Sequence, residues 1–200
     1  MKTGITGGIG SGKSFVCKRL ALRGIEVYDC DAAAKRLMRT SPELRRQLTE
    51  LIGGEAYFPQ KPEPSHMPQP PQNTGWVLNK AAVARFLLAS EENGRAVNAI
   101  VHPAVFRDFE ESGMEWMESA ILFESGANRL VDRVIVVTAP EEVRVQRVMA
   151  RDGISREKAL EWISRQWPQH RLCQLADFEI VNDGEADIDA QLDILFEQDS

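Results

Sequence analysis

A glycine-rich stretch near the beginning of the chain constrains its fold more than any other feature. Residues 7–14 read Gly-Gly-Ile-Gly-Ser-Gly-Lys-Ser and match G-x-x-x-x-G-K-[S/T], the pattern of a phosphate-binding loop. Glycines tolerate positive φ and leave no Cβ between the backbone N–H groups and an anion. The stretch therefore predicts a nucleotide site in an α/β protein. The alternative is a glycine-rich turn before an ordinary helix.

The sequence on either side fits such a loop. We expect a strand over residues 1–6 and a helix over residues 14–22, whose N-terminus would direct its free N–H groups and dipole at the phosphates. Lys13 would place a positive charge near the β- and γ-phosphates, and the Ser14 hydroxyl is a ligand suited to Mg²⁺.

Composition limits the class of protein. A chain of 200 residues with 43% hydrophobic residues can form one globular unit, with room for a smaller subdomain. The net charge of −6 argues against general nucleic-acid binding, which needs a basic face. The three cysteines form no C-x-x-C pair, so neither a disulfide framework nor a zinc site is indicated. With no apolar run of membrane-spanning length and no signal peptide, we expect a cytoplasmic protein.

Strand-like and helix-like segments alternate along the chain, which predicts an α/β fold with a parallel sheet covered by helices on both faces. The expected strands are residues 1–6, 25–28, 117–123, 133–137 and 178–181. The expected helices are residues 14–22, 32–39, 41–52, 78–89, 97–105, 138–149, 155–167 and 186–196. His102-Pro103 is expected to interrupt the helical stretch 97–105.

Residues 53–75 have a different composition. Six of the ten prolines lie there, and this density predicts a long surface loop, with a partner-binding polyproline segment as the alternative.

Two carboxylates follow the second expected strand. Ligands of open α/β sheets bind outside the carboxyl ends of the strands, and Asp29 and Asp31 fall at such an end. A carboxylate there can orient an acceptor hydroxyl, accept its proton or hold Mg²⁺. The alternative is that either residue caps the helix that follows.

Three arginines share a spacing of three and four residues. Arg144, Arg147 and Arg151 would lie on one face of a helix, and Gly153 follows as a hinge. They predict a lid that closes over ATP and offsets charge on the transferring phosphoryl group. The alternative is a solvated basic face paired with Glu141 and Glu142.

Taken together, these residues resemble the dephospho-coenzyme A kinase family over nearly the whole chain. The resemblance is carried by GITGGIGSGKS (4–14), YDCDA (28–32), NAIVHP (98–103), ILFE (121–124), QR (146–147) with Arg151, RQ (165–166), AD (176–177) and VNDG (181–184). It implies an adenylate-kinase-like P-loop kinase with a parallel five-stranded sheet in a core of about residues 1–40 and 115–200. An inserted helical coenzyme-binding subdomain would span about residues 41–114, and a lid about residues 145–160.

The implied reaction moves the γ-phosphoryl group of ATP, with Mg²⁺, to the 3′-hydroxyl of the dephospho-CoA ribose. Asp31, Lys13 and Arg147 would be catalytic, with Asp31 acting on the acceptor hydroxyl and Arg147 as the lid arginine. Dephospho-CoA would also contact His102. The residues expected to bind ATP are Gly8, Gly10, Ser11, Gly12, Lys13, Ser14, Phe15 and Arg151, with Mg²⁺ on Ser14. No nucleic acid, membrane or obligatory protein partner is implied.

The chain departs from the family pattern at three places. Phe15 replaces the usual Thr, Ala120 replaces a common Pro, and the Pro-rich residues 59–71 stand where the family has a short turn.

Three rival functions stay open. One is another small-molecule or nucleoside monophosphate kinase. A second is a GTPase-like switch, although Asn79-Lys80 does not continue into N-K-x-D. The third is a scaffold that binds through its Pro-rich segment.

Overall fold

The computed structural model describes residues 1–60 and 75–197. The chain divides into two compact units, Met1–Asp29 with Gly113–Ser200, and Cys30–Ser112. Each unit is described by itself below. Within the described ranges, no helix is both long and apolar enough to cross a membrane.

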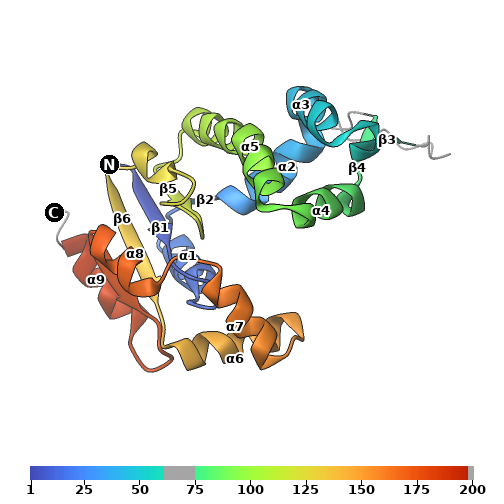
Figure 1. The fold of residues 1–200 in the computed structure, drawn as a ribbon. Coiled ribbons are helices and arrows are strands. Elements are labelled where there is room, and N and C mark those ends of the chain that lie inside the picture. Colours follow the sequence, from blue (N-terminus) through green and yellow to red (C-terminus); the bar gives the residue numbers. More distant parts are fainter. Residues whose placement is uncertain (61–74, 198–200) are drawn as a thin grey trace, which may run out of the picture. The chain divides into compact units, whose positions relative to one another are not determined.

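The first unit is built on a parallel sheet (Figure 1). Its strands are β1 (Thr3–Thr6), β2 (Val27–Asp29), β5 (Trp116–Glu118), β6 (Arg133–Thr138) and β7 (Phe178–Val181). Their order is β2-β5-β1-β6-β7, so β1 lies in the middle. Every residue of β1 is buried, and β6 is buried from its second residue onward, as expected for central strands of a sheet covered on both faces. The predicted α/β fold with a five-stranded parallel sheet is confirmed.

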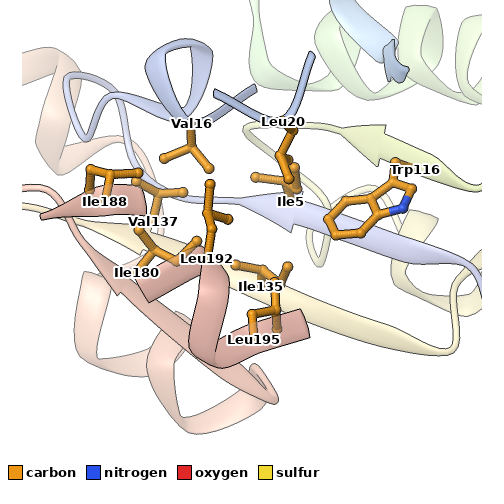
Figure 2. Packing of buried hydrophobic residues seen from close by; sticks show 10 residues of the cluster. All are labelled: Ile5, Val16, Leu20, Trp116, Ile135, Val137, Ile180, Ile188, Leu192 and Leu195. Carbon is orange, nitrogen blue, oxygen red and sulfur yellow. The ribbon is translucent and has the colours of Figure 1, made fainter. Parts of the chain in front are cut away.

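Helices of the first unit follow its strands. They are α1 (Lys13–Leu22), α6 (Glu141–Asp152), α7 (Arg156–Ser164), α8 (Gln169–Leu175) and α9 (Ile188–Glu197). Apolar side chains of α1 and α9 pack on one face of the sheet, as Figure 2 shows for Val16 and Leu192 around Ile135 and Val137. On the other face, a Cβ added at Gly4 of β1 would meet Leu122 at 2.9 Å, so the segment after β5 covers that side.

Charged side chains also join α1 to α9. Arg19 of α1 and Arg23, the C-cap residue of α1, both contact the carboxylate of Asp189, and Arg23 also pairs with Asp193 at 2.5 Å. Because α1 begins at the glycine-rich loop, these contacts help to fix its axis behind the loop.

The second unit is mainly helical. It contains α2 (Cys30–Thr40), α3 (Pro42–Ile52), α4 (Lys80–Ala89) and α5 (Glu91–Ser112). The Ser41 hydroxyl accepts a hydrogen bond from the Leu44 N–H at 3.3 Å, which caps α3 as a Ser-Pro start predicts. The sequence placed the start of the insertion near residue 41. In the structure α2 clusters with this unit, where Arg36 pairs with Asp108 of α5 at 2.5 Å and the Tyr57 hydroxyl donates to the Met38 carbonyl at 2.6 Å.

One expected helix and one expected strand differ from the structure. Helix α5 runs through Pro103 without interruption, because Val97, Val101, Val105 and Phe109 recur every four residues and bury one continuous face. The strand expected over residues 117–123 ends at Glu118. Beyond it the Ser119 hydroxyl accepts the Ile121 N–H at 3.3 Å, and the apolar run forms turns in which Leu122 is buried while Ile121 is 37% exposed.

The expected loop over residues 53–75 was also partly wrong. Gly54–Ala56 form a 3₁₀ turn, and β3 (Tyr57–Pro59) pairs antiparallel with β4 (Trp76–Leu78). Pro59 ends β3, where the missing N–H of a proline is tolerated at an edge. Residues 61–74, which hold the rest of the Pro-rich segment, lie outside the described residues.

Candidate active site

The glycine-rich loop connects the end of β1 to the start of α1. Gly10 and Gly12 have φ of 79° and 90°, a region that other residues rarely adopt. A Cβ on Gly12 would lie 2.0 Å from the Asn182 side-chain nitrogen, and one on Gly10 would lie 2.6 Å from the Arg144 carbonyl oxygen. Glycine is therefore required twice over, by conformation and by close packing.

The first turn of α1 opens at this loop. Gly12 occupies the N-cap position without a side-chain cap, and Ser14 is exposed in the first turn. The Phe15 side chain is 49% exposed. Its N–H donates to the Gly12 carbonyl at 2.9 Å, which closes the first turn of the helix.

Lys13 directly follows the loop glycines, and its side chain folds back onto the loop. Its side chain is buried, and Nζ donates to the Gly7 carbonyl at 2.8 Å. The Glu118 carboxylate lies 3.8 Å from the same nitrogen. Burial lowers the pKa of Lys13, and the negative charge of Glu118 opposes that lowering. The ammonium is thus held at the loop by backbone oxygens and a carboxylate.

Side chains from α6 brace the outside of the loop. Arg144 is buried, and its Nε donates to the Ile9 carbonyl at 2.9 Å. Burial lowers the pKa of this guanidinium. Arg147 reaches the Gly10 and Ser11 carbonyls from Nη1, both at 3.4 Å. Because these bonds go to carbonyl oxygens, the two arginines fix the loop without using any of its N–H groups.

Gln166 and Asn182 hold the loop as well, and their roles were open from the sequence. The Gln166 oxygen accepts the Ile9 N–H at 2.6 Å. Asn182, which follows β7, donates from Nδ2 to the Ser11 carbonyl at 3.0 Å. The position of Asn182 after a strand end was a signal in the sequence. The contacts themselves were not predictable, because the paired residues are 157 and 171 positions apart in the sequence.

The three arginines of the expected lid face separate in the structure. Arg144 and Arg147 contact the loop, whereas Arg151 is exposed and pairs with the neighbouring Asp152 at 2.7 Å. Helix α6 ends there, and Gly153 follows with a φ of 65°, as expected for a left-handed helix stop.

Asp31 and His102 belong to the second unit. Asp31 lies in the first turn of α2, two residues after β2 ends, and forms an ion pair with Lys35 one turn on. The His102 ring stacks on Phe106 of the same helix at 6.0 Å, and burial lowers its pKa. Asp29 ends β2 in the first unit, in register with Glu118 of β5. Asp31 and His102 thus make their contacts within the second unit, and Asp29 lies in the first.

At the carboxyl edge of the parallel sheet, a glycine cradle with a lysine connects a strand to a helix. The strands follow the order β2-β5-β1-β6-β7. This arrangement defines a P-loop kinase. The chain belongs to the dephospho-CoA kinase family, because a sequence model of that family matches residues 1–187.

Individual relatives agree with the family match. A dephospho-CoA kinase of Bacteroides fragilis is 38% identical over 199 residues, covering 96% of this chain and 89% of the relative. One from Chlorobaculum tepidum is 36% identical over 193 residues, covering 92% and 87%.

Solved structures show the same fold. The Thermus thermophilus protein TT1252 superposes with a TM-score of 0.76 at 31% identity, covering 100% of this chain and 98% of that one. A shikimate kinase from Bacteroides thetaiotaomicron gives a TM-score of 0.53 at 12% identity over 99% of this chain and 97% of its own. The second likeness shows the fold alone.

Proposed function

We propose that this chain transfers the γ-phosphoryl group of ATP to the 3′-hydroxyl of the dephospho-CoA ribose, which completes coenzyme A. The observation that carries the proposal is Lys13, buried in a glycine cradle 2.8 Å from the Gly7 carbonyl, in a chain of this family. Phosphoryl transfer needs little covalent chemistry from the protein, so positioning and charge stabilisation are the main tasks.

The residues of the loop fit ATP with Mg²⁺. Glycine at positions 8, 10 and 12 lets Arg144 and Asn182 pack closely against the loop and hold its shape, since a Cβ there would collide with them. The exposed Ser14 hydroxyl is an oxygen ligand of the kind that Mg²⁺ binds. When bound, the metal would offset the charge of the β- and γ-phosphates. Lys13 would exchange its carbonyl contact for a phosphate oxygen.

Asp31 would act on the acceptor. Its carboxylate is exposed in the first turn of α2, where it would orient the ribose hydroxyl and accept its proton as the bond to phosphorus forms. Lys35 forms an exposed ion pair with this carboxylate one helical turn away. In our proposal the second unit binds the coenzyme, with His102 as one contact.

We assign the arginines differently from the sequence expectation, which made Arg147 the lid arginine. The bonds from Arg147 to two loop carbonyls and to Asn182 support a positioning role in this conformation. Arg151 is the more exposed guanidinium, next to the Gly153 hinge, and supports a role on the phosphates when the lid closes. Closure would also exclude water from the transferring group.

A panel of acceptors tests the proposed function. ADP release is coupled to an optical readout with ATP, Mg²⁺ and one of dephospho-CoA, AMP or shikimate, beside a sample without acceptor. We expect release that depends on dephospho-CoA, with AMP and shikimate at the background. Release with AMP or shikimate alone would assign the chain to a different kinase activity on the same fold. Release that ignores every acceptor would leave an ATPase.

A further inference from the structure

One residue of the phosphate loop has its side chain in the core of another part of the first unit. The helices α6 and α7 pack on each other as a pair, and their shared core is formed by Val145, Val148, Ala159 and Ile163. The side chain of Ile9 packs against this core. Among the described residues of the cluster, Ile9 alone comes from outside the segment 145–163. The loop thus contributes an apolar residue to the helix pair.

The backbone of Ile9 is held by the same helix pair. The Arg144 Nε of α6 donates to the Ile9 carbonyl at 2.9 Å. The Ile9 N–H donates to the side-chain oxygen of Gln166, two residues after α7 ends, at 2.6 Å. At the next residue, Gly10, an added Cβ would lie 3.0 Å from Val148. Side chain, N–H and carbonyl of one loop residue are therefore all bound to the segments that carry α6 and α7.

Contacts of this kind join the loop and the helix pair into one cooperative unit. Opening of α7 would expose the Ile9 side chain and break its hydrogen bond to Gln166, so the loop would lose its support at the same moment. A ligand that binds only the closed form of such a unit stabilises all of it by mass action. The coupling is reciprocal, because the packed pair in turn favours the loop shape that binds the ligand.

We propose that Ile9 is the positioning residue that couples a nucleotide on the phosphate loop to the helix pair α6 and α7, where the sequence placed the lid. The nucleotide would order α7 through Ile9, without a contact of its own to α7. This inference rests on the proposed function only in that the loop binds a nucleotide, and neither the acceptor nor the transfer step enters it.

Hydrogen exchange read by mass spectrometry tests the coupling without acceptor or turnover. Peptides from α1, which begins at the loop, and from α7 are compared without ligand and with ADP and Mg²⁺. ADP is set at about 100 times the dissociation constant of each protein, so that mass action is the same for all. The proteins are the wild type, Ile9→Val, Ile9→Ala and Ile154→Ala. Thermal melts establish that each variant is folded.

Ile154 is the matched control. It is a partly buried isoleucine of the same cluster, as Ile9 is, but it lies next to Gly153 in the turn between the two helices. Ile154→Ala therefore removes the same atoms from the same core and leaves the loop residue in place. A purely structural role of Ile9 would give both alanine variants the same behaviour.

We expect ADP to slow exchange in both α1 and α7 of the wild type, by up to about 100-fold at this concentration. Ile9→Ala should keep the slowing in α1 and reduce the slowing in α7 to less than about threefold, because the coupling is lost. Ile9→Val should show a smaller loss in α7, and it decides the matter if Ile9→Ala does not fold. Ile154→Ala should speed exchange of α7 in both conditions, but ADP should slow it by the wild-type factor.

Two results would overturn the inference. One is an undiminished slowing of α7 in the Ile9 variants, which would mean that the nucleotide reaches the lid directly. The other is an equal loss in Ile154→Ala, which would mean that any weakening of the pair uncouples it. ADP that slows neither helix of the wild type would contradict the nucleotide site itself. Normal slowing of α7 in a protein that forms no coenzyme A would contradict the proposed reaction alone.

Discussion

The Arg147 guanidinium donates a hydrogen bond to the backbone oxygen of Asn182 at 2.9 Å. The same nitrogen reaches the Gly10 and Ser11 carbonyls, and Asn182 in turn donates to Ser11 at 3.0 Å. One arginine of α6 therefore ties the end of β7 to the phosphate loop. These contacts favour a supporting role for Arg147, which the sequence analysis had placed on the transferring phosphoryl group.

Replacing Arg147 should weaken the loop. We expect Arg147→Ala to lower the free energy of unfolding by about 2 kcal/mol, because hydrogen bonds made by charged groups contribute about that much. ADP affinity should fall about tenfold, since the loop loses its fixed shape. Arg147→Lys should not restore it, because an ammonium lacks the planar fork that reaches several carbonyls. Chemical unfolding and calorimetry measure both effects.

Arg156 provides the control for this substitution. It also lies on the α6–α7 segment, but it pairs at 2.7 Å with Glu142 on the exposed surface. Arg156→Ala should leave the free energy of unfolding nearly unchanged, because an exposed ion pair contributes little. Equal effects of the two substitutions would contradict the supporting role of Arg147.

Asp31→Asn should reduce turnover and leave nucleotide binding intact. We expect the rate constant for ADP release to fall at least about 10²-fold, because an amide cannot accept the proton of the acceptor hydroxyl. ATP affinity in the absence of acceptor should stay within about twofold, since in our proposal Asp31 acts only on the acceptor. Steady-state kinetics and calorimetry give the two values.

Lys35→Ala is the companion variant, because Lys35 is the ion-pair partner of Asp31. An exposed pair of this kind contributes about 0–1 kcal/mol, so turnover should change little. Near-normal turnover in Asp31→Asn would remove Asp31 from the mechanism.

Cys17 should be inert to alkylation in the folded protein. Burial raises the pKa of this thiol from 9.0 to about 12, and Glu118 and Asp29 add to the rise. At pH 8 the thiolate fraction would be about 10³-fold smaller than that of an ordinary cysteine, and the thiolate is the form that reacts. Iodoacetamide labelling followed by mass spectrometry should find Cys17 unmodified in native protein and modified after unfolding. Rapid native labelling of Cys17 would show that its surroundings are more open than described.

His102 should make stability depend on pH on the acidic side. Burial lowers its pKa from 6.5 in the folded state, so the unfolded chain binds the proton more readily. Protonation therefore favours unfolding: this destabilisation is fully present below the folded-state pKa and vanishes as the pH rises above about 6.5. The melting temperature of His102→Gln should consequently fall less than that of the wild type between about pH 7.5 and pH 5.5.

Exposed His170 supplies the control, since His170→Gln should keep the wild-type dependence. Identical pH profiles for His102→Gln and the wild type would contradict this account.

The phosphate loop was predictable because its chemistry is local. Eight consecutive residues specify the loop from Gly7 to Ser14, and the following helix is set by its own spacing. The parallel sheet was likewise predictable from the alternation of buried strands with helices. The end of β5 was not, because the apolar residues 120–123 that follow it form turns but have the composition of a buried strand.

The side chains that hold the phosphate loop from other segments were not predictable, for a different reason. Gln166 contacts Ile9 across 157 positions of sequence, and no local pattern in either segment encodes that distance. Arg144 looked the same as Arg147 and Arg151 on a helical face, yet only packing against Gly8 and Ile9 buries it. The pairing of Glu118 with Lys13 follows from strand order, which a single sequence leaves open.

The most direct test of the central claim uses two acceptors that differ in one oxygen. Wild-type protein is incubated with ATP, Mg²⁺ and either dephospho-CoA or its 3′-deoxyribose analogue, and the products are identified by mass spectrometry. The account predicts ADP and coenzyme A from dephospho-CoA, and neither above background from the analogue. Phosphorylation of the 3′-deoxy analogue, or no coenzyme A from dephospho-CoA, would contradict transfer to the ribose 3′-hydroxyl.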